Sequence, residues 1–509
     1  MIELKDQHVL ILGLGASGLA MARWCARQGA HVSVADTRES PPNLAALNSD
    51  VPNASFLPGP FDHSLVAGLN YSRVFGSPGL SPAAVAPVLV AEDAHSVALN
   101  GELSLFSAAL ADLKLARAYT PKVIAVTGTN GKTTVTALTG QLVERAGKSV
   151  AVAGNIGPTL LDTLAARLDN NNLPDVWVIE LSSFQLHTVE DFEPTVATVL
   201  NVSQDHLDWH GSLQAYVEAK AKVFGATSLM VLNRGDAAVM AMLAVPPKTV
   251  NAKDRKALPP REHVTFGADL PARPGDFGIE EVNGMAWLVR AQDADGARRR
   301  RNEAPEELFI QRLMPADALR IRGRHNAVNA LTALALAAAA GCALAPMLYG
   351  LREYRGEPHR VESIGTVDGV EFFEDSKGTN VGATLAALNG LGADRKLVAI
   401  LGGDGKGQDF EPLAKPVSRF VRAVVLIGRD APSIRAALAA TGVPLANAAS
   451  MVEAVAIANR AAHAGDAVLM SPACASFDMF DNYGHRAAVF CDAVKALAND
   501  AGLALEGQA

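Results

Sequence analysis

A glycine-rich loop between a strand and a helix constrains this 509-residue chain more than any other feature. An apolar run at 122–126 leads into Thr127–Thr134, which reads TGTNGKTT, and a helical pattern follows over 135–146. Glycines let backbone N–H groups converge on phosphate oxygens, and the helix N-terminus adds positive potential. The spacing from Gly128 to Gly131 is shorter than in the common phosphate loop, but the strand–loop–helix context predicts a nucleotide-phosphate site in an α/β domain.

Two side chains of this loop carry the expected chemistry. Lys132 can reach the outer phosphates of a nucleotide, and the hydroxyl of Thr133 can bind magnesium. We therefore expect ATP and Mg²⁺ as ligands.

A second glycine turn lies near the start of the chain. The apolar run His8–Leu12 leads into the glycines of GLGASG, residues 13–18, and a second strand, His31–Ala35, ends at Asp36. This is a βαβ unit in which the turn binds a diphosphate and the acidic residue accepts from a ribose hydroxyl. Either NAD or a nucleotide-diphosphate substrate offers both groups, but hydride transfer needs no ATP site.

Further strands are expected to end in polar clusters. In the middle of the chain, 175–181 runs into ELSS and 195–202 contains NVSQDHLD. After Gly350, four strand-like runs are expected at 370–374, 396–401, 423–427 and 467–470. Three of these four run directly into DSKGTN, GGDGKGQDF and SPACASFD. Because ligands bind beyond the carboxyl ends of parallel strands, we expect the three clusters to share one site.

Two segments have other patterns. Region 255–320 is turn-rich and charged, which indicates hairpins or an insertion, and its run Arg298–Arg301 is expected to be a solvated loop. The alanine-rich stretch Ala330–Leu348 contains Gly341 and Pro346 and follows a polar turn, so we expect a buried helix there and no membrane span.

The composition limits the class of protein. Hydrophobic residues make up 49% and charged residues 19%, as in a soluble α/β protein of several domains. The net charge of −8 gives no general case for binding nucleic acid. The four scattered cysteines and the absence of a signal-peptide pattern at the N-terminus predict a cytoplasmic protein with reduced thiols.

Taken together, the motifs resemble the Mur ligases, the ATP-dependent amide-forming enzymes of peptidoglycan synthesis. The resemblance runs through all three lobes in order, and it is carried by TGTNGKTT, GNIG, ELSSFQL, NVSQDHLD, YVEAK, RHNAVNA, EPHRVE, DSKGTN, GGDGK and SPACASFDMFDNY. It implies an α/β protein with three domains. These are a Rossmann-like domain over 1–101 that binds the UDP-substrate, a central P-loop ATPase-like domain over 102–354 with a mainly parallel sheet, and a Rossmann-like domain over 355–509 that binds the amino acid.

Within the family, the GLGASG turn and the C-terminal motifs look most like the branch that adds D-glutamate. That resemblance implies UDP-N-acetylmuramoyl-L-alanine and D-glutamate as substrates, an acyl-phosphate intermediate, release of ADP and phosphate, and a monomer. Another amino-acid-adding Mur ligase, a folylpolyglutamate-type synthetase, an NAD-dependent dehydrogenase and a non-catalytic nucleotide-binding regulator are the alternatives. The complete first lobe disfavours the folate enzyme.

The resemblance also implies site residues, position by position. The catalytic set is Lys132, Glu180, His206, Lys220 and Lys377. The ATP-binding set is Gly128, Thr129, Asn130, Gly131, Lys132, Thr133, Thr134, Asn326, Asn329, Arg360 and Asp375. The UDP-substrate set is Ala16, Ser17, Asp36, Thr37, Arg38, Gly79, Asn155 and His206. The D-glutamate set is Thr379, Lys406, Ser476 and Tyr483. The metal set is Thr133, Glu180, His206 and Lys220.

Lys220 has a special expected role. The resemblance implies that its amine is carbamylated, which would turn a cation into an oxygen ligand beside magnesium. Lys222 is the alternative, but Tyr216 stands four residues before Lys220, in the register of the family's pattern. The resemblance assigns no base for the attacking amine.

Overall fold

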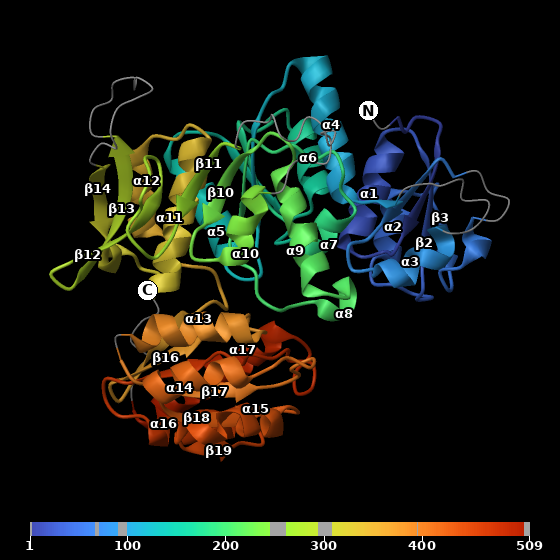
Figure 1. Cartoon of the computed structure of the whole chain (residues 1–509). Helices are drawn as coiled ribbons and strands as arrows, with labels where there is room; N and C mark the ends of the chain where they lie inside the picture. Colours follow the sequence, from blue (N-terminus) through green and yellow to red (C-terminus); the bar gives the residue numbers. More distant parts are fainter. Residues whose placement is uncertain are drawn as a thin grey trace.

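The computed structural model describes residues 3–66, 71–89, 99–244, 261–293, 308–393 and 395–502. Three β-sheets follow one another along the chain, each flanked by helices (Figure 1). The sheet of the middle segment lies between the other two in sequence, and its helices contact both neighbouring lobes.

The N-terminal lobe has a parallel sheet of five strands in the order β3-β2-β1-β4-β5. Its strands are β1 (His8–Leu12), β2 (His31–Asp36), β3 (Ser55–Pro58), β4 (Arg73–Gly76) and β5 (Leu99–Asn100). Its helices are α1 (Ala16–Arg27), α2 (Leu44–Asp50) and α3 (Pro82–Leu89). The expected βαβ unit is confirmed, with residues 13–15 of GLGASG between β1 and α1 and residues 16–18 in the first turn of α1.

The central lobe has nine strands in the order β14-β13-β12-β11-β10-β9-β6-β8-β7. They are β6 (Lys122–Thr127), β7 (Val150–Gly154), β8 (Val176–Glu180), β9 (Val196–Val199), β10 (Leu229–Asn233), β11 (His263–Phe266), β12 (Phe277–Val282), β13 (Met285–Asp293) and β14 (Leu308–Pro315). The sheet is parallel from β7 to β12 and antiparallel from β12 to β14. The turn-rich region therefore forms hairpins at the edge of the sheet, as expected, whereas Arg298–Arg301 lies outside the described residues.

The helices of this lobe position its loops. They are α4 (Glu102–Arg117), α5 (Lys132–Arg145), α6 (Leu160–Asp169), α7 (Ser183–His187), α8 (Leu207–His210), α9 (Leu213–Ala221), α10 (Ala237–Ala241), α11 (Arg324–Ala339) and α12 (Leu344–Glu353). The expectation of one buried helix over 330–348 was wrong. Residues 330–337 are buried, but α11 ends at Ala339, the chain turns at Gly341, whose φ of +82° favours glycine, and residues 341–348, which include the start of α12, are partly exposed.

The C-terminal lobe has six strands in the order β15-β16-β20-β17-β18-β19, all parallel except the β15–β16 pair. They are β15 (Glu362–Val367), β16 (Val370–Glu374), β17 (Leu397–Gly402), β18 (Val421–Ile427), β19 (Leu445–Asn447) and β20 (Ala467–Met470). Its helices are α13 (Val381–Gly392), α14 (Ala414–Phe420), α15 (Ala431–Leu438), α16 (Met451–Ala461) and α17 (Tyr483–Asp500). The four expected strands are β16, β17, β18 and β20, and the expectation missed the two edge strands.

The hydrophobic cores connect the first two lobes and leave the third separate. One cluster runs from the N-terminal lobe through α4 and α6 into the central sheet, and it includes Trp24, Phe106 and Trp177. The clusters on the two faces of the C-terminal sheet contain only residues beyond 360. The first two lobes thus share a core, whereas the third has cores of its own. None of the helices in the described part of the chain is long and apolar enough to cross a membrane.

Candidate active site

The phosphate loop joins β6 to α5. Gly128 and Gly131 have φ angles of +153° and +85°, which favour glycine, and a Cβ on Gly131 would lie 2.9 Å from the side-chain oxygen of Asn329. The helix begins at Lys132, three residues before the expected start, so the end of the loop is the first turn of α5. Lys132 Nζ donates to the carbonyls of Gly128 and Thr129, both at 2.9 Å. Burial lowers the pKa of this lysine, and the charge of Glu180 opposes that shift.

An asparagine of the neighbouring strand end holds the loop in place. The backbone N–H of Asn130 donates to Asn201 Oδ1 at 2.9 Å, and Asn201 Nδ2 donates to the Asn130 carbonyl at 3.0 Å. Asn201 was absent from the predicted site residues. The signal was its position as the first residue of NVSQDHLD, directly after β9.

Glu180 offers an unpaired oxygen beside the phosphate loop. It ends β8 and is 2% exposed. Its Oε1 accepts from Asn155 Nδ2 at 2.8 Å, whereas its Oε2 is buried with no hydrogen-bond partner among the described residues. The hydroxyl of Thr133 accepts from Arg360 at 2.6 Å. A buried carboxylate oxygen without a partner fits a Mg²⁺ ligand, because this ion takes oxygen donors.

His206 lies at the turn that precedes α8. Its φ of +53° is the left-handed conformation that a non-glycine residue seldom adopts, and its ring meets Phe184 edge-on. Burial lowers the pKa of His206, and the neighbouring carboxylate of Asp205 opposes that shift. The ring remains 41% exposed, and it faces the charges of Lys132 and Lys220.

Lys220 lies under the phosphate loop. It is 1% exposed on α9, its Nζ donates to the Gly128 carbonyl at 2.9 Å, and it lies 4.4 Å from the centre of the Tyr216 ring. Burial, reinforced by the charge of Lys132, holds the pKa of Lys220 well below its ordinary value. Lys222 instead donates to the carbonyl of His187, away from the loop.

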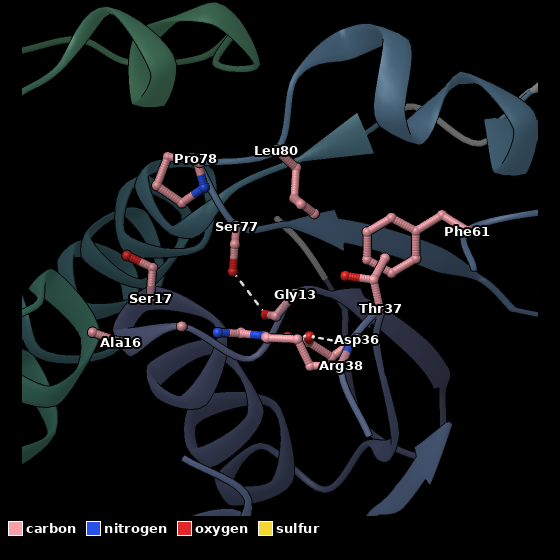
Figure 2. A pocket seen from close by; sticks show the side chains of 12 residues that line it. Gly13, Ala16, Ser17, Asp36, Thr37, Arg38, Phe61, Ser77, Pro78 and Leu80 are labelled. Atoms are coloured by element: carbon pink, nitrogen blue, oxygen red, sulfur yellow. Dashed lines mark hydrogen bonds and ion pairs between the residues drawn. The ribbon is translucent and has the colours of Figure 1, made fainter. Parts of the chain in front are cut away.

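A pocket of about 390 Å³ opens at the GLGASG turn of the N-terminal lobe (Figure 2). The structure brings together all six of the N-terminal residues expected to bind the UDP-substrate, which line this pocket: Ala16, Ser17, Asp36, Thr37, Arg38 and Gly79. Phe61, Ser77 and Leu80 line it too, and they were not predicted because no motif of the fingerprint includes them.

Asp36 is held in its charged form at the floor of this pocket. Its carboxylate accepts from the Arg38 guanidinium and from the backbone N–H of Leu14, each at 2.8 Å. The Arg38 hydrogen bonds hold the pKa of Asp36 well below its usual range. Figure 2 shows this pair beside the turn, where Ser77 donates to the Gly13 carbonyl at 2.7 Å.

The segment between the central and C-terminal lobes reaches back to the phosphate loop. Arg360 makes the bond to Thr133 described above, and its neighbours His359 and Val361 both have positive φ, at 66° and 51°. His359 Nδ1 lies 2.7 Å from Glu374 Oε2. The ligand atoms of His359, Glu362 and Glu374 lie within 4.8 Å of one another, but Glu362 accepts from the backbone N–H of His359, Glu374 bonds to its ring, and none of the three was a predicted metal ligand.

Three loops of the C-terminal lobe and the first residue of α17, Tyr483, carry the residues expected to bind D-glutamate. Lys377 Nζ lies 3.8 Å from the centre of the Tyr483 ring. The loops that hold Lys406 and Ser476 are joined by an antiparallel bridge between Asp404 and Ala475. Thr379 follows Lys377 on the third loop. Electrostatic interactions of Lys377 with Lys132 and of Lys406 with His206 place this face of the lobe toward the phosphate loop.

The remaining predicted ATP residues lie on α11 and directly after β16. Asn326 and Asn329 are on α11, where Asn329 Nδ2 donates to Asn326 Oδ1 at 3.1 Å. Asp375 is buried and accepts from the Ser471 hydroxyl at 2.6 Å, and burial raises the pKa of Asp375 to about 7. Two residues that were not predicted join the central and C-terminal lobes: Asn380 Nδ2 donates to Asp205 Oδ2 at 3.2 Å.

Comparison with family models covers each lobe. The Mur ligase MurD-like N-terminal domain matches residues 7–99, the Mur ligase middle domain matches 126–259, and the Mur ligase glutamate ligase domain matches 359–474. The chain is 69% identical to the UDP-N-acetylmuramoylalanine--D-glutamate ligase of Albidiferax ferrireducens, with 100% of both chains covered. It is 57% identical to the protein of the same name from a Polaromonas species, covering 99% of this chain and 100% of the relative.

Solved structures of lower identity share the fold. UDP-N-acetylmuramate-alanine ligase from Thermotoga maritima has a TM-score of 0.53 at 19% identity, covering 96% of this chain and 100% of that chain. A MurF ligase from Thermotoga maritima, solved in complex with ADP, has a TM-score of 0.54 at 16% identity, covering 98% and 96%.

Proposed function

This chain belongs to the Mur ligase family, and we propose that it is the ligase that joins D-glutamate to UDP-N-acetylmuramoyl-L-alanine with hydrolysis of ATP to ADP and phosphate. The observation that carries the proposal is the full-length identity of 69% to a ligase of that name. The geometry agrees with it, because the N-terminal lobe has a pocket at the GLGASG turn, and the lysine-bearing loops of the C-terminal lobe lie near Lys132 and His206 of the central lobe.

The reaction has two chemical steps. An oxygen of the alanyl carboxylate attacks the γ-phosphorus of ATP, the bond to the β-phosphate bridging oxygen breaks, and ADP leaves. The D-glutamate amine then attacks the acyl-phosphate carbon, and the C–O bond to phosphate breaks in a tetrahedral intermediate. The ammonium group of D-glutamate gives up two of its three protons in this second step, one to the released phosphate and one to the solvent, and the products are an amide that keeps one N–H and inorganic phosphate.

In the first step, the phosphate loop and its partners hold the negative charge. We assign the predicted ATP-binding residues to this step, with Lys132 and the backbone of the loop on the phosphates and Arg360 reaching them from the linker. Thr133 and Glu180 would hold one Mg²⁺ and His206 a second. When bound, Mg²⁺ neutralises charge that develops on the phosphate oxygens.

Lys220 is proposed as the carbamylated lysine. A neutral amine adds to CO₂, forms a C–N bond and releases a proton, and the product carries one negative charge. Lys220 is buried at the Gly128 carbonyl and next to Lys132, where two positive charges would repel each other. A negative carbamate at this place would instead attract Lys132, which supports the assignment.

The substrates are assigned to the outer lobes. The pocket at the GLGASG turn would take the UDP portion, with Asn155 and His206 nearer the carboxylate that reacts. Thr379, Lys406, Ser476 and Tyr483 would take D-glutamate, whose two carboxylates need cations and hydroxyl donors. Lys377 would lie closer to the phosphates of ATP. The domain limits 1–101, 102–354 and 355–509, the cytoplasmic location and the monomeric state are proposed from the sequence.

A phosphate-release assay tests the function. Purified protein is incubated with ATP, Mg²⁺, UDP-N-acetylmuramoyl-L-alanine and one amino acid of a panel that includes D- and L-glutamate. We expect turnover with D-glutamate and none without the nucleotide substrate. Turnover with another amino acid alone would reassign the chain within the family, and a change in absorbance at 340 nm with NAD would favour a dehydrogenase.

A further inference from the structure

A single amide joins the C-terminal lobe to the phosphate loop. Asn380 is the last residue of DSKGTN and the N-cap of α13, and it is 7% exposed. Its Oδ1 accepts from the backbone N–H of Ala383 at 2.9 Å, which caps its own helix. Its Nδ2 donates across the lobes to Asn130 Oδ1 and to Asp205 Oδ2, each at 3.2 Å.

The two partners belong to the segments that surround the proposed nucleotide site. Asn130 lies within the phosphate loop, where Asn201 holds its backbone on both sides. Asp205 precedes His206, and its carboxylate faces the charges of Lys132 and Lys220. One side-chain amide thus contacts both the phosphate loop and the segment that bears the proposed metal ligand.

The start of α13 lies against the central lobe without space for a larger residue. A Cβ on Gly382 would lie 2.8 Å from the Ser203 hydroxyl and 2.9 Å from Asn130 Nδ2. Toward the other end of the helix, a Cβ on Gly390 would lie 2.4 Å from His325 Nδ1. Because glycine occupies both points of contact, α13 approaches the central lobe closely enough for the Asn380 amide to reach its partners.

Helix capping alone does not explain the asparagine. Asp, Ser and Asn cap helices about equally well, and capping uses only the acceptor oxygen. The Nδ2 amide, a donor separate from the capping oxygen, distinguishes Asn380 from aspartate and serine, and both of its hydrogen bonds cross between the lobes.

We propose that Asn380 is a closure latch, a positioning residue whose Nδ2 fastens the amino-acid loop to the phosphate loop and to Asp205. This proposal rests on the proposed ligase function. The loop that Asn380 ends carries Lys377 and Thr379, so fastening it sets the distance between the bound amino acid and the acyl phosphate. Near-attack geometry of this kind is what a closing lobe contributes to the rate.

Two substitutions separate the latch from the helix cap. Asn380→Ser keeps a capping oxygen and loses the Nδ2 amide group, so that only one shorter hydroxyl remains for both tasks. Asn380→Asp keeps the size and the cap but sets a carboxylate against Asp205. We expect kcat/KM for D-glutamate to fall about ten-fold in the Ser variant, because two hydrogen bonds are lost and one of them is to a charged group. In the Asp variant kcat/KM should fall further, because the new carboxylate also repels Asp205. Melting temperature and Kd for the nucleotide substrate should stay at the wild-type values.

The matched control is Asn389→Ser on the same helix. Its side chain is exposed and, within the described part of the chain, donates to the Leu385 carbonyl four residues back, so kcat/KM should be unchanged. Asp205→Asn supplies a donor opposite position 380, so Asn380→Asp should cost less in that background than alone. The latch is overturned if Asn380→Ser has the wild-type kcat/KM. It is also overturned if Asn380→Asp lowers kcat/KM by the same factor in the wild type and in Asp205→Asn.

The latch and the ligase function can fail separately. If the wild type uses another amino acid, the same variants are compared with that amino acid. If the wild type shows no turnover, X-ray scattering with and without the nucleotide substrate and a non-hydrolysable ATP analogue compares the variants. A radius of gyration that falls in the wild type and in Asn389→Ser but not in Asn380→Asp supports the latch, and equal behaviour of all three overturns it.

Discussion

Lys220 and Lys222 are two residues apart but have different surroundings. Lys220 is buried and donates to a carbonyl of the phosphate loop, whereas Lys222 donates to the carbonyl of His187 on another segment. In an α-helix, residues two positions apart point in different directions, so only one of the pair can face the loop. The choice of Lys220 from its register with Tyr216 therefore agrees with the geometry, although the modification itself stays a prediction.

Substitution of Lys220 tests its proposed charge reversal. We expect Lys220→Ala to lower the rate of phosphate release roughly 100-fold or more, because the proposed carbamate, a negatively charged ligand for the metal, is lost. Acetate or another short carboxylic acid should restore part of the activity by entering the space that the side chain leaves. Lys222→Ala serves as the control and should retain most of the activity. Full activity in Lys220→Ala would contradict the assignment.

Asp375 predicts a pH dependence of stability. Its pKa is raised by burial to about 7 in the folded chain, whereas an unfolded aspartate has a pKa of about 3.9. Between these values the folded state holds the extra proton, so this group makes the protein less stable as pH rises from about 4 to 7. The free energy of unfolding falls by at most about 1.4 kcal/mol per pH unit in this range.

Asp375→Asn removes this titration and keeps an acceptor for Ser471. The melting temperature of the wild type should fall relative to that of the variant between pH 5 and about 7 and then level off. The exposed Asp492→Asn in the same lobe serves as a surface control. A wild-type-to-variant difference that is constant across this range would show that Asp375 does not titrate there.

Single residues were predictable where a motif surrounds them. Asp36 ends the strand that the fingerprint defines, Arg38 follows it, and Glu180 ends a strand beside the phosphate loop. Phe61 and Leu80 were not predictable, because their place in the pocket depends on how distant loops fold together. Asn380 was visible as a motif residue, but its bonds to another lobe depend on the relative placement of the lobes.

At the scale of elements, glycines allow the turn after β1 to pack closely against the start of α1. Gly13 has a φ of +85°, and a Cβ on Gly18 would lie 2.0 Å from the Gly13 carbonyl oxygen. A Cβ on Gly15 would meet no protein atom within 4 Å, although Gly15 lines the pocket. The third glycine is thus required by packing, whereas the second leaves space on the ligand side.

These two glycines give a paired prediction. Gly18→Ala should lower the free energy of unfolding by about 1–3 kcal/mol or more, since backbone must move to admit the methyl group. Gly15→Ala should fold with a nearly unchanged melting temperature and bind UDP-N-acetylmuramoyl-L-alanine about ten-fold more weakly, because its methyl group enters the ligand's space. Thermal unfolding and calorimetric titration of both variants check this. Equal effects of the two on stability would contradict it.

Strands with apolar sequences were predictable, and edge strands were not. The four expected strands of the C-terminal sheet include its centre, where both faces are covered and the apolar run is continuous. β15 and β19 are the edges, and the burial of their residues is mixed. The start of α5 was placed three residues late, because the polar residues Lys132, Thr133 and Thr134 resemble loop but form the first turn of the helix.

At the scale of the whole molecule, the distribution of the cores determines which lobe can move. The N-terminal and central lobes share a continuous cluster, and ion pairs from α1 to α6 join Arg23 with Asp162 and Arg27 with Asp169. The C-terminal lobe meets the central one through the polar contacts of Asn380 and Arg360 and through α13 against α11. Polar contacts of this kind exchange readily for water, so the third lobe is the one expected to open.

Opening would turn the C-terminal lobe about residues 350–360. The linker is fixed at its start, where Gln141 of α5 donates to the Gly350 carbonyl at 2.9 Å, and the contact of Arg360 with Thr133 is at its far end. X-ray scattering of the wild type should show a larger radius of gyration without ligands than with the nucleotide substrate and a non-hydrolysable ATP analogue, because bound phosphates attract Arg360 and Lys377. Gly382→Ala should reduce this compaction, since its methyl group would press on Ser203 and Asn130. Equal compactness of the wild type with and without ligands would show that the lobes stay closed throughout the cycle.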